Sequence, residues 1–363
     1  MKWSLKLGSF AGIGVFIHWT FILLIGWILF SSLSAGQSLV QALIGLGFIL
    51  ALFTCVVLHE FGHALTARHY GVGTRDITLL PIGGVARLEG IPEKPMQEFW
   101  IAIAGPLVNV VIFVILFVVL WGMDPSGALV DPRSPQAGQL TQLMWLNLFL
   151  AGFNLLPAFP MDGGRVLRAL LATRVSRRRA TAVAANIGQG MAILFGIIGF
   201  MINPFLIFIA VFVFLGAQAE NEAVEMQSNL AGLRVRDGMM TRFRTLSVDD
   251  PIDKAVVELL AGSQQDFPVL DGGRYHGILR RNDLIMALTD GRRGASVGEV
   301  VCCPCTPAAE TDDLSATLET MGKNQWSTLP VLGEGEIIGL LTLENVGELL
   351  MIHAAQSGSG KTT

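Results

Sequence analysis

Long apolar runs dominate the first 220 residues, and few charged residues interrupt them. Six apolar segments can be marked, at about 12–31, 38–66, 99–122, 141–157, 181–202 and 204–219. A helix that spans a bilayer needs roughly 20 apolar residues, which the first three segments supply, whereas the other three are shorter or interrupted. The pattern predicts an α-helical polytopic membrane protein in which residues 1–220 form about six spans.

The pattern changes after residue 220, because residues 220–353 are charged, rich in turn-forming residues and without any spanning run. The segments 267–288 and 329–350 align without a gap, and each predicts a strand, a turn, a strand and a helix. One such unit buries little core, so we expect the two to pair as a soluble α/β domain. We divide this region into a linker at 221–238, a first motif at 239–296, a second motif at 297–353 and a disordered tail at 354–363.

Arginine is distributed unevenly between the loops. Arg68 and Arg75 follow the second span and several arginines follow the fourth, whereas the loops 32–37 and 123–140 contain only Arg133. Because basic loops stay on the cytoplasmic side of the cell membrane, both chain ends should be cytoplasmic, and the second and fourth spans should end at one depth. The net charge of -4 and the lack of a basic block argue against a nucleic-acid partner.

Two histidines and a glutamate lie within the second span, in the stretch "VVLHEFGHAL". His59 and His63 are four residues apart, so on a helix they project from one face and can bind one zinc ion, while Glu60 can reach a water on that ion as a base. Ionisable groups in a span are costly and usually functional. A catalytic zinc needs a third protein ligand, and Asp162 in "PMDGGR" is the acidic residue at a matching depth.

Three features together resemble the site-2 protease family of intramembrane zinc metalloproteases: "HEFGH", "FNLLPAFPMDGGR" and the basic-loop topology. The resemblance covers roughly residues 1–220, with Met161 where the family usually has leucine. It implies that His59, His63 and Asp162 bind one Zn2+ per chain, that Glu60 is the general base, and that Asn154 donates to the oxyanion. The implied function is an endopeptidase, with its active site near the cytoplasmic side, that cleaves transmembrane segments of single-span, membrane-anchored substrates.

A second class of function is a zinc-binding membrane sensor or transporter without hydrolase activity. Glu60 distinguishes the two classes, because a hydrolase needs a base beside its zinc ligands and a binding site does not. The segment "IAGPLVNV" at 103–110 resembles another pattern of the family. It predicts close packing of a helix through Gly105 beside the active-site helix, with Asn109 as a structural polar contact.

Residues 76–89, "DITLLPIGGVARLE", predict a small β-hairpin that turns near Gly83 and Gly84. The resemblance to the family implies that this hairpin is membrane-associated, and an extended substrate could add a strand to its edge. We therefore expect a substrate-positioning role for Ile82, Gly83, Gly84 and Val85, against the alternative of a merely structural hairpin.

The repeated motifs resemble a tandem pair of CBS domains, a module that often binds adenine nucleotides such as ATP, ADP or AMP and often forms homodimers. The resemblance implies a hydroxyl and an aspartate as ligand contacts in each copy. The first copy keeps Asp283 but has Arg280 and Arg281 in place of the hydroxyl, and the second keeps Thr342 but has Asn345 in place of the acid. One composite site formed by Asp283 and Thr342 and a purely structural dimerising module both agree with this pattern.

Overall fold

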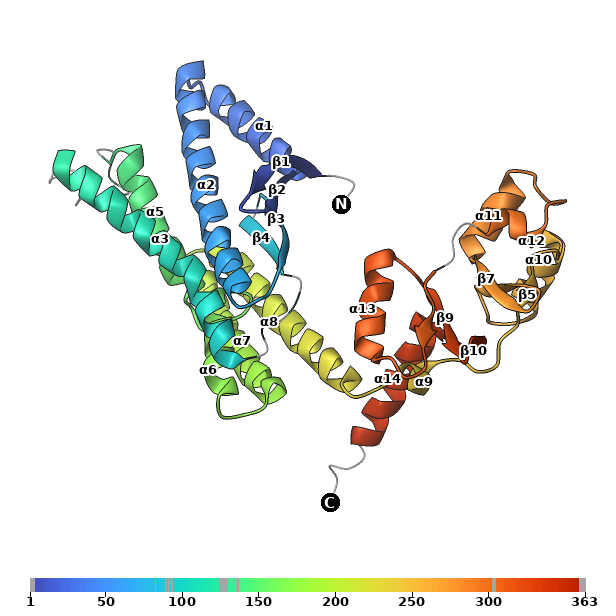
Figure 1. The fold of residues 1–363 in the computed structure, drawn as a ribbon. Coiled ribbons are helices and arrows are strands. Elements are labelled where there is room, and N and C mark those ends of the chain that lie inside the picture. Colours follow the sequence, from blue (N-terminus) through green and yellow to red (C-terminus); the bar gives the residue numbers. More distant parts are fainter. Residues whose placement is uncertain are drawn as a thin grey trace. The chain divides into compact units, whose positions relative to one another are not determined.

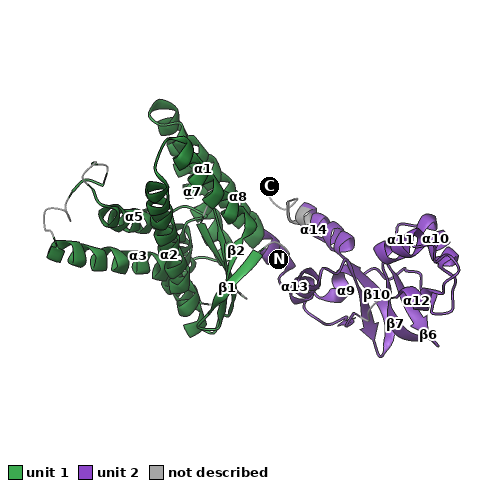
Figure 2. Cartoon of the chain, turned by 90° about the horizontal axis from the view of Figure 1, so that it is seen from above, with its two compact units in different colours: residues 1–224 green, residues 225–363 purple. Residues whose placement is uncertain are grey.

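The computed structural model describes the chain apart from residues 1–3, 82, 89, 91, 93, 124–129, 133, 135–136, 302–304 and 359–363. The chain divides into two compact units, Met1–Val224 and Glu225–Thr363, which Figure 2 distinguishes by colour. The first unit contains long apolar helices and a small sheet, and the second contains short helices around two further sheets (Figure 1).

A four-stranded sheet begins the first unit, with strand order β1-β2-β3-β4. Its strands are β1 (Ser4–Phe10), β2 (Ile13–His18), β3 (Thr74–Leu80) and β4 (Gly83–Leu88). The central pair β2 and β3 is parallel, and the other two pairs are antiparallel. In β2 the alternation characteristic of a half-buried strand places Ile13 and Val15 in the core. The first apolar run is therefore part strand, and helix α1 (Trp19–Ser34) begins only after His18, whose Nδ1 accepts from the backbone N–H of Thr20.

Four helices are long and apolar enough to cross a bilayer within the described part of the chain. They are α2 (Leu39–His69), α3 (Pro95–Met123), α7 (Arg177–Met201) and α8 (Phe205–Leu230). The prediction of about six spans is thus wrong in number. Helices α1 and α5 (Gln139–Asn154) have 16 residues each, which is about 24 Å of helix against a hydrocarbon core of roughly 30 Å.

The predicted hairpin exists as part of the larger sheet, and its turn falls directly before Gly83. The register pairs Leu80 with Gly83, so the strands meet just before the two glycines near which we expected the turn. Pro81 explains this position, because a residue without an N–H ends β3 before the glycines are reached. Gly83 begins β4, with a positive φ of 142°.

A buried ionic cluster joins four helices at one end of the first unit. Arg168, on α6 (Asp162–Ala172), donates from Nε to Glu98 of α3 at 2.7 Å and also pairs with Glu220 of α8. Arg177 of α7 lies 3.2 Å from the second oxygen of Glu98. The guanidinium of Arg168 also stacks over the ring of Phe159. Because unpaired charges are costly to bury, these pairs hold the four helices in one arrangement.

The second unit confirms the repeated strand, turn, strand and helix. The first copy forms β6 (Phe267–Asp271), β7 (Arg274–Leu279) and α11 (Arg281–Thr289), and the second forms β9 (Thr328–Gly333), β10 (Glu336–Thr342) and α14 (Leu343–Gly358). Helix α14 thus continues into the segment 354–363 assigned to the tail. The amphipathic helices α10 (Ile252–Ala261) and α13 (Leu314–Asn324) precede the copies. The remaining elements are α9 (Val235–Gly238), β5 (Leu246–Ser247), α12 (Val297–Val300) and β8 (Ala308–Ala309).

Each copy forms its own three-stranded sheet, with strand orders β5-β6-β7 and β10-β9-β8. The core of the first copy packs Phe267, Val269 and Leu279 against Leu284, and the core of the second packs around Val331 and its neighbours. The two copies also contact each other, because the β7 residue Ile278 is part of the core of the second copy. The pairing expected from the sequence is therefore present.

Candidate metal centre

Two histidines on α2 and an aspartate that lies 103 and 99 residues away from them in the sequence converge on one point in the first unit. His59 Nε2 and His63 Nε2 lie 3.2 and 3.1 Å from Asp162 Oδ2, and the two nitrogens lie 3.1 Å from each other. All three residues are buried. Ligands held at 2.0–2.1 Å from a tetrahedral zinc ion would lie about 3.3 Å apart. The described residues therefore fit zinc in both ligand type and spacing.

Helix α3 orients both imidazole rings from behind. Nδ1 of His59 lies 2.6 Å from Oδ1 of Asn109, and Nδ1 of His63 lies 2.7 Å from the backbone oxygen of Ile101. Both partners can only accept, so each Nδ1 carries the proton and each Nε2 presents a lone pair. Two lone pairs and a carboxylate oxygen then face one another within 3.2 Å. Three acceptors at this distance repel unless a cation lies between them.

Asn109 also takes part in a series of buried hydrogen bonds that continues to a third helix, α5. Its Nδ2 donates to Oδ1 of Asn147 on α5 at 3.2 Å, and Asn147 donates to the backbone oxygen of Leu143 at 2.9 Å. Asn147 is fully buried. Sequence reasoning identified Asn109 as a structural contact but missed Asn147, although Asn147 lies seven residues before Asn154 and so on the same face of α5.

The close approach of α3 to α2 depends on Gly105. A Cβ atom at this position would lie 2.7 Å from Nε2 of His59 and still closer to Nε2 of His63. Real Cβ atoms essentially never come within 3.0 Å of another heavy atom. The packing of Gly105 beside the active-site helix, expected from the sequence, is confirmed, and the glycine contacts the two histidines directly.

The histidines and Asp162 open onto a cavity of about 420 Å³ that also contains Glu60 and Asn154. Neither of these side chains has a hydrogen-bond partner among the described residues, so both are available to a substrate. Arg165, one turn after Asp162 on α6, lines the same cavity and was not identified from the sequence. The cavity thus combines a three-ligand cluster, a carboxylate, an amide and a cation.

Strand β4 forms one wall of this cavity. Gly83, Gly84 and Val85 line it, whereas Ile82, the fourth expected substrate-positioning residue, lies outside the described residues. A Cβ at Gly84 would lie 2.7 Å from Cγ of Glu60, so the strand packs directly on the active-site helix. Since β4 is the last strand of the sheet, no strand of the described ranges lies along its outer edge.

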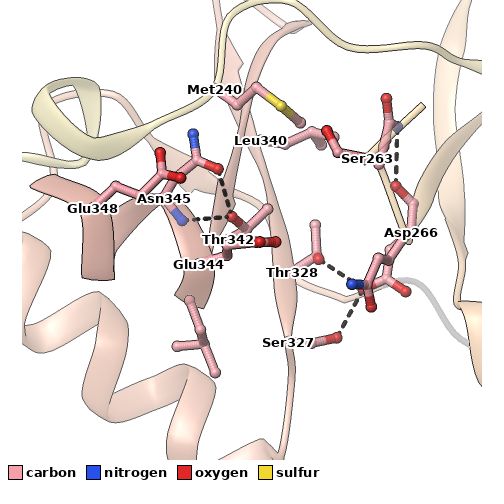
Figure 3. A pocket seen from close by; sticks show the side chains of 13 residues that line it. Met240, Ser263, Asp266, Ser327, Thr328, Leu340, Thr342, Glu344, Asn345 and Glu348 are labelled. Carbon is pink, nitrogen blue, oxygen red and sulfur yellow. Dashed lines mark hydrogen bonds between the residues drawn. The ribbon is translucent and has the colours of Figure 1, made fainter.

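The two residues expected to bind a nucleotide lie on different elements of the second unit, Asp283 on α11 and Thr342 at the end of β10. Thr342 lines a cavity between the two copies in the second unit (Figure 3), and Asp283 is not among the residues that line it. Thr342 Oγ1 accepts from the backbone N–H of Asn345 at 3.1 Å and so caps the start of α14. Asp283 lies in the first turn of α11. The composite site of Asp283 and Thr342 stays a prediction.

Both parts of the chain are similar to known proteins. Residues 47–125 and 136–198 match Peptidase family M50, and residues 234–290 and 297–351 match the CBS domain. The chain is 37% identical to the zinc metalloprotease MJ0392 of Methanocaldococcus jannaschii over 280 residues, which cover 77% of this chain and 78% of the relative. It is 30% identical to the Rip3 protein of Mycobacterium tuberculosis, with 97% of this chain and 94% of Rip3 covered.

A solved structure is also similar to this chain. The site-2 protease from Methanocaldococcus jannaschii is 40% identical, with a TM-score of 0.45, and the match covers 60% of this chain and 95% of that one. The match to Peptidase family M50 includes His59, His63 and Asp162.

Proposed function

The chain belongs to peptidase family M50, the site-2 protease family of zinc metalloproteases, and we propose that it cleaves the membrane-spanning segments of single-span, membrane-anchored proteins. The observation that supports this most directly is the position of Glu60. Its carboxylate lies in the same cavity as the His59, His63 and Asp162 cluster, on a helix that is long and apolar enough to cross a bilayer. A cavity of this kind suits hydrolysis of a substrate that is itself in the membrane.

In the proposed mechanism, His59, His63 and Asp162 hold the zinc ion. Zinc bound there would polarise the scissile carbonyl and lower the pKa of a water molecule to about 7. Glu60 accepts a proton as the water oxygen attacks the carbonyl carbon, and it delivers that proton to the amine as the C–N bond breaks. Asn154 donates a hydrogen bond to the carbonyl oxygen as negative charge develops on it. Asn109 and the backbone of Ile101 keep both imidazoles in the tautomer that binds metal.

Glu60 also favours a hydrolase over a zinc sensor or transporter. The carboxylate is unpaired among the described residues, and a site that only stores or passes zinc gains nothing from it. Gly84 packs against this side chain and restricts its position. A carboxylate within a membrane span is energetically costly, and a role in proton transfer explains why one is present here.

We propose that the substrate is held as an extended strand along the outer edge of β4. A peptide bond in a helix is shielded by the hydrogen bonds of that helix, so a transmembrane substrate must unwind before it can be cleaved. The free edge of β4 offers backbone partners to the unwound segment, and the same strand lines the cavity beside Glu60. A substrate paired there would lie next to the cluster.

Disulfide cross-linking tests the strand arrangement. We expect Val85→Cys, in a Glu60→Gln background without the native cysteines, to cross-link to every second residue of a cysteine-scanned substrate, because side chains of a strand alternate. Leu107→Cys, an exposed residue of α3 outside the cavity, should show no such pattern. Cross-links from Val85→Cys at every third or fourth substrate residue would indicate a helix and contradict the proposal.

The chain is a multi-pass membrane protein, and we propose that both of its ends lie in the cytoplasm with the active site near that side. The arginines after α2 and around α6 and α7 support this orientation. Labelling of single cysteines placed near each end, in intact and in permeabilised cells, measures it. Labelling of either end from outside intact cells would exclude this orientation.

We propose that the CBS pair regulates cleavage by binding an adenine-containing ligand and that it joins two copies of the chain. The cavity between the motifs supports ligand binding. Dimerisation is supported by apolar side chains that are exposed on the neighbouring helices α10 and α11, with relative exposures of 64% at Val257, 81% at Leu260, 45% at Ile285 and 56% at Met286. Helices of a soluble domain rarely expose such a group without a partner.

Charge substitution on this apolar face tests the homodimer. We expect Leu260→Asp with Ile285→Asp to halve the mass of the detergent-solubilised protein, measured by light scattering, because a buried unpaired carboxylate opposes association. Arg274→Asp, an exposed position on β7, should leave the mass unchanged. A wild-type chain that is monomeric across the accessible concentration range would rule out the dimer.

A further inference from the structure

The hydrogen bond between His59 and Asn109 does not by itself determine which nitrogen of the imidazole carries the proton. An asparagine amide has one end that accepts and one end that donates, and the two ends have nearly the same shape. With Oδ1 of Asn109 toward Nδ1 of His59, as in the structure, Nε2 is free for metal. With the amide turned over, the proton would lie on Nε2 and block the metal. A further contact must therefore fix the amide.

Asn147 makes this contact from α5. Helix α3 packs against both α2 and α5, which places Asn109 between the histidine and Asn147 (Figure 1). Nδ2 of Asn109 donates to Oδ1 of Asn147 at 3.2 Å. The relative exposures of Asn109 and Asn147 are 1% and 0%, so bulk water does not compete for this hydrogen bond. If Asn109 turned over, two amide oxygens would face each other.

The amide of Asn147 is oriented in turn by a group that cannot turn over. Its Nδ2 donates to the backbone oxygen of Leu143, one helical turn earlier on α5, at 2.9 Å. A carbonyl oxygen only accepts, so the end of Asn147 that faces it must be the donating end. The same Nδ2 lies 3.5 Å from the sulfur of Cys55 on α2, which is a weak acceptor. Oδ1 of Asn147 is thereby left for Asn109.

These groups form a directed series from a backbone carbonyl to a metal ligand. The oxygen of Leu143 requires the donating end of Asn147, and the oxygen of Asn147 requires the donating end of Asn109. The oxygen of Asn109 then requires the proton on Nδ1 of His59. Turning over either amide would leave like groups facing each other in a buried site, where unmade hydrogen bonds are costly.

The second histidine needs no such series. Nδ1 of His63 lies 2.7 Å from the backbone oxygen of Ile101, which fixes its tautomer directly. A different role for Asn147 is helix packing alone, since asparagines in membrane helices often bond across to a neighbouring helix. Packing accounts for a contact between Asn109 and Asn147, but it gives the direction of their hydrogen bond no effect on the metal.

We propose that Asn147 is a positioning residue of the metal centre, which holds the amide of Asn109 in the orientation that leaves Nε2 of His59 free to bind zinc. The inference rests on the zinc site of the proposed function. It adds a residue from a third helix that does not itself line the active-site cavity.

The zinc affinity of the full-length protein in detergent, measured by competition with a chromogenic chelator, tests this role. Asn147→Leu removes both ends of the amide at nearly constant size. We expect it to lower the affinity about tenfold, the lower end of the range found for partners of metal ligands. Asn147→Asp keeps an acceptor toward Asn109 in either protonation state, so its affinity should stay within about threefold of wild type. Unchanged affinity in Asn147→Leu would overturn the proposal.

A substitution at Asn109 separates orientation from packing. Asn109→Asp gives His59 an acceptor whichever way the carboxylate is turned, so Asn147 is no longer needed to orient it. In an Asn109→Asp background, Asn147→Leu should therefore lower the zinc affinity less than about twofold. Loss of packing would instead lower the affinity by the same factor in both backgrounds, and that result would contradict the proposal.

Met144→Ala is the matched control for packing, because Met144 is also fully buried on α5 but has no polar group to orient. Its zinc affinity should stay within about twofold of wild type. A loss as large as that of Asn147→Leu would assign the effect to packing and refute the positioning role. If Asn147→Leu does not fold, Asn147→Ser replaces it, with the same expected loss. Serine bonds back to the carbonyl four residues earlier and lacks the atoms that face Asn109.

One further variant separates this inference from the zinc site on which it rests. His59→Ala should abolish tight zinc binding, because it removes a ligand. If His59→Ala binds zinc as tightly as the wild type, the zinc site and this inference both fail. If the zinc affinity depends on His59 but not on Asn147, the inference alone fails and the proposed function stands.

Discussion

Glu60→Gln is expected to lower the rate of substrate cleavage by about 10³-fold while leaving zinc bound. The amide keeps the size of the side chain, so Gly84 still packs against it, but it cannot accept the proton of the attacking water. The measurement is cleavage of a model single-span substrate by purified protein, together with metal analysis of the same sample.

Zinc content is the essential control for this variant. Glu336→Gln, at an exposed position of the second unit, provides the matched substitution and should retain full activity. If Glu60→Gln cleaved the substrate at the wild-type rate, Glu60 would not be the base and the sensor or transporter class would regain support. If zinc were lost together with activity, the effect would be structural.

Gly105→Ala is expected to remove both zinc and activity, although it adds only one methyl group to a long helix. The new Cβ would lie within 3.0 Å of ring atoms of His59 and His63, so the rings must move away from Asp162. Loss of this alignment should weaken zinc binding by at least about 10- to 100-fold, the range found when the partners of metal ligands are changed. Zinc retained after dialysis against a weak chelator measures the effect.

Helix α3 offers its own control for this substitution. Gly122 lies near the other end of the same helix and has no heavy atom within 4 Å of the position of an added Cβ. Gly122→Ala should therefore retain full zinc and full activity. A Gly105→Ala protein with normal zinc content would show that the helices separate easily, and it would contradict the tight packing described above.

The chemistry of the site could be predicted from sequence because it depends on short spacings. The four-residue interval between His59 and His63 determines their common face on any helix, and a broken span with one acid left few candidates for a third ligand. Asn147 could not be found in this way. Its importance comes from a contact with Asn109, 38 residues away in sequence, and a single asparagine in an apolar helix has no distinctive local pattern.

The secondary structure of the first apolar run was predicted incorrectly, because hydropathy alone does not distinguish a strand from a helix. Residues 12–31 form one apolar run, yet its first part is strand β2, because pairing with β3 satisfies the backbone and overrides the apparent helix. Apolar content alone cannot distinguish a buried strand followed by a short helix from one spanning helix. The secondary structure of the repeat in the second unit was easier to predict, since the two aligned copies independently indicate the same elements.

The buried ionic cluster connects the helix that leaves the first unit with the helix that carries Asp162. Helix α8 runs without a break from Phe205 to Leu230 and so passes from the first compact unit into the second. Glu220 on this helix is paired with Arg168, which lies on the helix that begins with Asp162. If the regulation proposed above moves α8, the Glu220–Arg168 pair connects that movement to α6, the helix that begins with Asp162.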